Sequence, residues 1–209
     1  MGIASFYHRC FTQLPWVTLM VTNGTLFVAA DALAQSFESR KEDTSTPTDL
    51  GQRWDLHRSA RFLAFGTGMA PLLAEWNKFI EHGFPIKNKR GAVVASGLAR
   101  RVLMDQLAFA PFGLLLFVGS MGLMEGRRTL PALEEKFRDV YWPALKANWA
   151  IWPFLQLVNF SVVPLGYVSS LVFVFAANNR LRVPFSASCG VAWTLYLSLL
   201  NQRDVPEGA

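Results

Sequence analysis

Charge is scarce in this sequence. Of its 209 residues, 17% are Asp, Glu, Lys or Arg and 52% are hydrophobic, whereas soluble domains average roughly 25% charged residues. A water-soluble domain with so little charge would have difficulty covering its surface with polar groups, so the composition favours a membrane protein. The scarcity is greatest between positions 147 and 179, where 33 consecutive residues carry no charge.

The chain also lacks the residue patterns of enzymes and metal sites. Its two cysteines, Cys10 and Cys189, form no CxxC or zinc spacing, and we expect buried, free thiols because free cysteine behaves as a small hydrophobe. Its three histidines, His8, His57 and His82, are scattered near loops or a terminus. HExxH, GxSxG and phosphate-loop motifs are missing. We therefore predict no catalytic residue, no metal site, no cofactor and no enzymatic activity.

The net charge of +5 comes from basic residues in the segments between apolar blocks. Lys and Arg at such places anchor membrane spans and meet anionic lipid headgroups. The lipid bilayer is therefore the expected partner, and nucleic acid is not. The difference in Lys and Arg content between alternate loops is too small to predict an orientation.

Uncharged runs locate the candidate membrane spans, since one crossing needs about 20 apolar residues. The runs are 10–30, 62–74, 106–124, 147–179 and 183–202. The second run is short but continues to Ile80, and its Gly66, Gly68, Ala70 and Ala74 form a thin face that suits a helix buried among others. A chain in lipid must satisfy its own backbone, and no barrel-like alternation occurs, so we predict an all-α multi-span bundle with four principal spans and an extra apolar insert.

The charged segment 125–146 has apolar residues that recur every three or four positions. This spacing predicts an amphipathic helix lying along the membrane interface. Thr129 followed by Pro131 is typical of a helix start.

Polar residues inside apolar spans are costly, so each is a candidate site. They are Asp31, Gln35, Arg58, Arg61, Asp105, Gln106, Gln156 and Asn159. These groups could line an aqueous path, or they could pair with one another and hold the bundle together. Pairing is favoured for most of them, and the pore-lining role stays open.

Aromatic residues and a proline stand at the entrance of the fourth run. Trp149 and Trp152 suit an aromatic belt at the membrane interface, and Pro153 suits the first turn of a helix, where it costs little. Pro164 is then expected to end or kink the same helix.

Several motifs together resemble the Mpv17/PMP22 family of small integral membrane proteins. They are D-x-x-x-Q at Asp31 and Gln35, R-x-x-R at Arg58 and Arg61, D-Q at Asp105 and Gln106, W-x-x-W-P-x-x-Q-x-x-N-F-x-x-V-P from Trp149 to Pro164, and W-x-x-Y-L-S from Trp193 to Ser198. The resemblance implies one domain over 1–209 with a motif-rich part at 142–202. It also marks structural motif residues, namely Trp76, Pro111, Trp149, Trp152, Pro153, Phe160, Pro164, Trp193, Tyr196 and Ser198.

Two departures from the family pattern stand out. Ala74 occupies a position where the family usually has histidine, so any role of that histidine is absent here. The stretch between Pro164 and Trp193 is also about fourteen residues longer than in the family, and removing 167–180 restores the family spacing. We predict that 167–180 translates an unspliced intron; the alternative is a real loop or an extra hydrophobic hairpin.

The resemblance implies a non-enzymatic protein of an organelle membrane. It suggests a pore for solutes or ions, or a modulator of permeation, in the mitochondrial inner membrane, with a role in mitochondrial homeostasis. The alternative is a scaffold that organises proteins of the peroxisomal membrane. Either function is compatible with a homo-oligomer.

Overall fold

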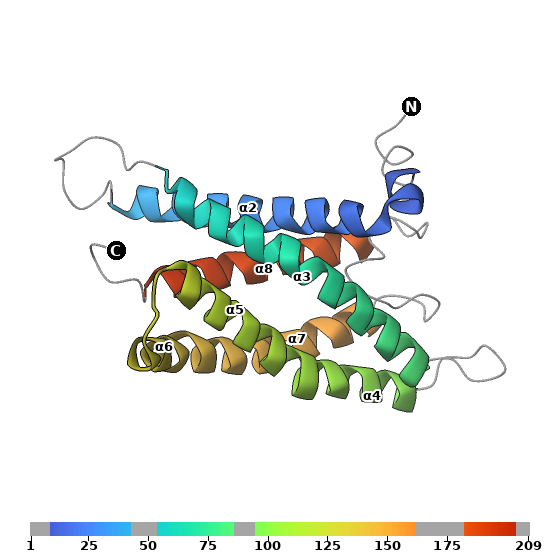
Figure 1. The fold of residues 1–209 in the computed structure, drawn as a ribbon. Helices are drawn as coiled ribbons and strands as arrows, with labels where there is room; N and C mark the ends of the chain where they lie inside the picture. Colours follow the sequence, from blue (N-terminus) through green and yellow to red (C-terminus); the bar gives the residue numbers. More distant parts are fainter. Residues whose placement is uncertain (1–8, 43–53, 86–94, 162–181, 204–209) are drawn as a thin grey trace.

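The structure is a computed structural model that describes residues 9–42, 54–85, 95–161 and 182–203 (Figure 1). Every regular element within these ranges is a helix, which confirms the predicted all-α class for this part of the chain. The elements are α2 (Pro15–Glu42), α3 (Leu56–Gly83), α4 (Ala95–Met104), η1 (Asp105–Phe109), α5 (Ala110–Met124), α6 (Leu130–Lys136), η2 (Phe137–Tyr141), α7 (Trp142–Ser161) and α8 (Arg182–Gln202). Pro164 and the predicted insert 167–180 lie outside the described residues.

Two short π-helical turns join shorter helices into long rods. Met104 and Ala110 keep right-handed helical backbone angles on either side of η1, so α4, η1 and α5 form one continuous rod. Lys136 and Trp142 do the same around η2, which joins α6 to α7. Figure 1 shows α6 and α7 in one row, with the α4–α5 rod crossing beside them.

The main core is an apolar cluster that draws residues from α3, α5, η2, α7 and α8. Its largest fully buried side chains are Phe62 of α3 and Phe117 of α5. The Phe117 ring meets the edges of Phe62 and Phe65, with centroids 5.9 and 5.2 Å apart, a favoured arrangement for aromatic pairs. The cluster therefore ties α3, both rods and α8 together.

α2 joins this core through close packing against α3. Ala70 and Ala74 of α3 are buried with Leu19 of α2, and a Cβ added at Gly66 would lie 2.8 Å from the Phe27 ring. The predicted thin face of the second run is thus confirmed at these positions. It is wrong at Gly68, where no heavy atom of the described chain outside its own helix comes within 4 Å of an added Cβ.

The segment 125–146 packs into the bundle as α6, η2 and the start of α7. Its predicted start is confirmed, because α6 begins at Leu130 with Thr129 as the N-cap. Its apolar stripe, however, packs inward: Val140 is fully buried in the main core, and Phe137 and Tyr141 pack against that core. The stripe therefore covers α5, and a position along the membrane interface stays a prediction.

Pro153 lies well inside a helix. The helix that carries it begins at Trp142, so the prediction of a proline in the first helical turn is wrong. A proline in a helix interior has no N–H to donate, so it leaves the carbonyl of Trp149, one turn earlier, without its usual backbone donor.

Two helices of the described chain are long and apolar enough to cross a bilayer. They are Pro15–Ser39, with mean hydropathy 1.5, and Ala99–Met124, with mean hydropathy 2.0. Large apolar side chains remain exposed on both, including Val21 on the first and Leu115 on the second. Such outward apolar faces suit contact with lipid.

Candidate functional site

A buried carboxylate on α2 is the centre of a polar network. Asp31 is fully buried, and its Oδ1 lies 2.7 Å from Nε of Arg58 and accepts a 2.7 Å hydrogen bond from the Ser198 hydroxyl. Its Oδ2 accepts hydrogen bonds from Ser59 at 2.8 Å and from Gln35 at 2.9 Å. The carboxylate therefore has donors from α2, α3 and α8.

Arg58 supplies the positive charge of this network and is itself well partnered. Its Nη1 and Nη2 donate to the carboxylate of Glu38 at 2.6 and 3.2 Å. Nη2 also donates to the Ser198 hydroxyl at 2.9 Å. A buried ion pair is tolerated when its geometry is good and its remaining hydrogen-bonding sites are filled, and both conditions hold here.

Gln35 fixes the start of α3 against the end of α2. Its Oε1 accepts from the backbone N–H of Asp55 at 2.9 Å, and Asp55 in turn caps α3 by accepting from the backbone N–H of Arg58 at 2.8 Å. Arg61 faces Asp55, with 3.9 Å between Nη2 and Oδ2. The structure thus brings Asp31, Gln35 and Arg58 together, and it leaves Arg61 at the edge of the network.

Asp105 belongs to a second group, where α3 meets η1. The indole N–H of Trp76 donates to Oδ1 of Asp105 at 2.7 Å. The same indole stacks on the Phe109 ring, with centroids 5.1 Å apart and planes 24° apart. Two motif regions that are far apart in sequence therefore meet around one carboxylate.

Pro111 explains an unusual contact of Trp149. In the π-helical turn the N–H of Ala110 donates to the carbonyl of Asp105, five residues back. The next donor in this register would be residue 111, but proline has no N–H, so the carbonyl of Gln106 lacks a backbone partner. The indole N–H of Trp149 donates to that carbonyl at 2.8 Å. Trp149 therefore takes the place of the missing backbone donor.

Three buried polar atoms on η1 and α7 have no hydrogen-bond partner in the described part of the chain. They are Oε1 of Gln106, Oδ1 of Asn148 and Nε1 of Trp152. Asn148 and Trp152 are one turn apart on α7. The ring of Trp152 packs against the ring of Trp193 on α8, with centroids 6.2 Å apart. Each buried polar atom without a partner costs about 1–3 kcal/mol. Two acceptors and one donor are thus available inside the bundle.

A further buried ion pair was missed by the sequence analysis, which expected the segment 125–146 to form an amphipathic helix at the membrane interface. Lys136 is fully buried and donates to Oε2 of Glu125 at 2.5 Å. Asn201 of α8 donates to Oε1 of the same carboxylate at 2.7 Å. The signal was present in the sequence, because Lys136 follows Leu133 by three residues and precedes Val140 by four. It therefore lies on the apolar stripe of its helix.

Of the remaining motif residues, some have side-chain contacts in the structure and others have only a described backbone. Pro111 also accepts a 3.4 Å hydrogen bond from the Tyr141 hydroxyl, and the rings of Trp193 and Tyr196 lie 5.4 Å apart. For the other motif positions within α7 the backbone is described and the side chains are not; these positions are Gln156, Asn159 and Phe160. Both cysteines are free thiols, but they are only half-buried.

These features define a class of protein: a helical membrane bundle in which buried ion pairs join apolar helices. Within the described residues no group of three or more His, Cys, Asp or Glu side chains could hold a metal ion. Comparison with known proteins then identifies the family.

The chain belongs to the Mpv17/PMP22 family. Residues 122–198 match the family described as Mpv17 / PMP22 family. Protein sym1 of Schizosaccharomyces pombe is 33% identical, with 98% of this chain and 93% of the relative aligned. Protein SYM1 of Gibberella zeae is 31% identical over 95% and 97% of the two chains, and Protein SYM1 of Saccharomyces cerevisiae is 31% identical over 97% and 92%. No solved structure matches.

Proposed function

We propose that this protein is a non-enzymatic pore, or part of one, that passes small solutes or ions through the mitochondrial inner membrane and so supports mitochondrial homeostasis. Four principal spans would cross the membrane, two of them the long apolar helices Pro15–Ser39 and Ala99–Met124. The observation that carries the proposal is the set of buried polar atoms of η1 and α7 that have no partner in the described chain.

The two polar regions of the bundle are suited to different roles. The carboxylate of Asp31 and the guanidinium of Arg58 are already occupied by each other and by neighbouring side chains, so they suit pairing of helices. Gln106, Asn148 and Trp152 each offer a hydrogen-bonding atom with no partner in the described chain. Pore selectivity depends on such lining groups, so we assign the path to the region between η1, α7 and α8.

Recordings from purified protein in planar bilayers test this function. The native protein should conduct, and Asn148→Leu, which removes the amide at similar size, should change the unitary conductance. Ile151→Leu is the matched control, since Ile151 lies on the exposed side of the same helix. Asp105→Asn should change the selectivity between cations and anions, because it removes a charge next to Gln106.

The outcome of the recordings separates the pore from the scaffold. A folded protein that never conducts, but co-purifies with a stable partner in mild detergent, would refute the pore and support the peroxisomal scaffold. Localisation is a separate test: a fluorescent fusion that stays in mitochondrial membranes after carbonate extraction supports the proposed location. Retention in peroxisomes would overturn it.

A further inference from the structure

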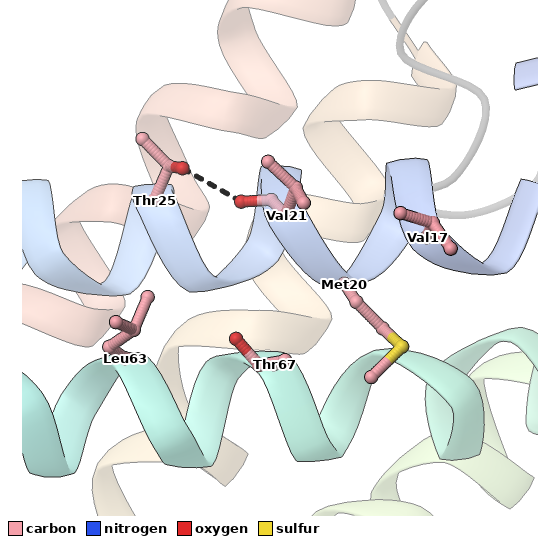
Figure 2. A pocket seen from close by; sticks show the side chains of 6 residues that line it. All are labelled: Val17, Met20, Val21, Thr25, Leu63 and Thr67. Atoms are coloured by element: carbon pink, nitrogen blue, oxygen red, sulfur yellow. Dashed lines mark hydrogen bonds between the residues drawn. The ribbon is translucent and has the colours of Figure 1, made fainter. Parts of the chain in front are cut away.

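A groove runs along the outer side of the contact between α2 and α3 (Figure 2). Its volume is about 370 Å³, and it is lined by Val17, Met20, Val21, Thr25, Leu63 and Thr67. Figure 2 shows the two helices side by side, with Met20, Leu63 and Thr67 in the space between them and Val21 and Thr25 on the edge of α2 away from α3 in this view. The groove therefore has walls from both helices.

The lining of the groove is apolar in its chemistry. The hydroxyl of Thr25 donates to the backbone carbonyl of Val21 at 2.7 Å, as the dashed line in Figure 2 shows, so its hydrogen bond is made within α2. Val17 and Val21 are 52% and 62% exposed, and Leu63 is 45% exposed. In a membrane span, such exposed apolar side chains meet hydrocarbon chains instead of water.

A close helix contact closes the inner side of the groove. A Cβ added at Gly24 would lie 2.5 Å from Oγ1 of Thr67 and 2.9 Å from Cδ1 of Leu63. Because Gly24 has no side chain, α2 and α3 approach closely here. The groove is thus a shallow channel on the outside of the bundle, and it does not lead into the interior.

Charged and aromatic groups stand at one end of this groove. Trp16 precedes Val17 in sequence, and the Lys78 ammonium lies 4.9 Å from the centre of the Trp16 ring. Lys78 Nζ also lies 2.7 Å from Oε1 of Glu75, and both side chains are more than half exposed. Trp16 stands at the beginning of the apolar helix Pro15–Ser39, the level at which tryptophan meets lipid headgroups.

The length of the groove fits part of an acyl chain. Thr25 follows Trp16 by nine positions, which is about 14 Å at 1.5 Å per residue. The groove therefore begins at the interface and extends into the hydrocarbon layer, along the direction in which a lipid chain runs.

We propose that this groove binds one zwitterionic glycerophospholipid. An acyl chain lies along the groove, the lipid phosphate binds the Lys78 ammonium, and the headgroup ammonium binds the Glu75 carboxylate beside Trp16. The charges of the protein and of this lipid are complementary: the Lys78 ammonium and the Glu75 carboxylate are adjacent on the protein, as the phosphate and the ammonium are adjacent in the headgroup. An anionic lipid without an amine would instead meet repulsion from Glu75.

Native mass spectrometry of the full chain in mild detergent tests this site. The protein is offered equal amounts of phosphatidylethanolamine and phosphatidylglycerol. We expect one phosphatidylethanolamine to be retained in preference. Lys78→Met and Glu75→Gln should each weaken its retention roughly tenfold, because each removes one charge-assisted hydrogen bond. Glu75→Gln should also raise the retention of phosphatidylglycerol, since it removes the repulsive charge.

Matched variants separate specific binding from general lipid adhesion. Asp139→Asn removes a charge from another exposed ion pair, Arg138 with Asp139, and should leave the lipid preference unchanged. Val21→Trp should fill the groove and reduce retention of both lipids; if it fails to fold, Lys78→Met and Glu75→Gln, both at exposed positions, still test the headgroup contacts. Equal retention of the two lipids, or a preference that survives both charge variants, would overturn the proposal. Neither result depends on whether the protein conducts.

Discussion

Replacing Arg58 with leucine should destabilise the protein more than any change at its surface. In the native structure Nε of Arg58 lies 2.7 Å from Oδ1 of Asp31, and the two side chains are 4% and 0% exposed. The leucine variant leaves the carboxylate buried without its counter-ion. Removing one partner of a buried ion pair costs about 3–5 kcal/mol, and we expect a loss of that size in the free energy of unfolding.

A double-mutant cycle with Asp31 tests whether this loss in the free energy of unfolding comes from the ion pair. Asp31→Leu alone should also be costly, because it leaves the guanidinium of Arg58 with Glu38 as its remaining carboxylate partner. The double variant removes both buried charges and leaves only Glu38, whose side chain is 28% exposed, without its partner. Replacing a whole buried pair by apolar residues is often close to neutral, so the double variant should be more stable than either single variant.

Reversible unfolding by sodium dodecyl sulfate, followed by tryptophan fluorescence and circular dichroism, measures these differences. Asp139→Asn is the control, because the pair it breaks is exposed and exposed pairs contribute below about 1 kcal/mol. If Arg58→Leu lowers stability no more than this control does, the network is not holding the helices. Additive losses in the double variant would show that the two charges do not act as a pair.

Three further predictions concern other parts of the chain. Trp149→Phe should lower the free energy of unfolding by about 1–3 kcal/mol, since it leaves the Gln106 carbonyl without a donor. Adding Pro111→Ala should recover part of that loss, because alanine supplies a backbone N–H. Equal stability of the single and double variants in the same unfolding assay would contradict this. Gly66→Ala should lower the free energy of unfolding by about 1–3 kcal/mol, because the added methyl meets the Phe27 ring of α2. Gly68→Ala should raise it by about 0.5–1 kcal/mol through the lower backbone entropy of the unfolded chain. If Gly66→Ala unfolds at a higher detergent concentration than Gly68→Ala, the described packing of α2 on α3 is refuted. Sequencing of cDNA across codons 160–190 should show that the mature transcript lacks the codons for 167–180. If every read retains these codons, the intron hypothesis is refuted.

Asp31, Gln35 and Arg58 of the network follow from the sequence, but Glu38, Ser59 and the role of Ser198 do not. Asp31 and Gln35 are four residues apart, so any helix places them on one face, and a buried carboxylate needs a cation such as Arg58. Ser198 could be recognised only as a motif residue. Its contact with Asp31 depends on how α8 packs against α2 and α3, which local spacing does not determine.

The rod that contains Lys136 was harder to predict. Spans were located as uncharged runs, so the charges between 125 and 146 ended one span and began the next. The structure shows instead that a charge on the apolar stripe is tolerated when a partner such as Glu125 is buried with it. The same criterion placed the helix start too late, and for this reason Pro153 was expected in a first turn. The π-helical turns also escaped prediction, since no simple periodicity signals them.

The separations along the chain within the Asp31 network set an order for its assembly during synthesis. The carboxylate accepts hydrogen bonds from a hydroxyl 28 positions later, in α3, and from another 167 positions later, in α8. Arg58 and Ser59 of α3 are therefore available to neutralise and bind this carboxylate long before the ribosome reaches the last helix. A chain that terminates before α8 keeps the contacts of Asp31 with α3 but loses the hydrogen bond from Ser198. Premature stop codons late in the gene should thus yield chains in which α2 and α3 are paired but α8 does not complete the network.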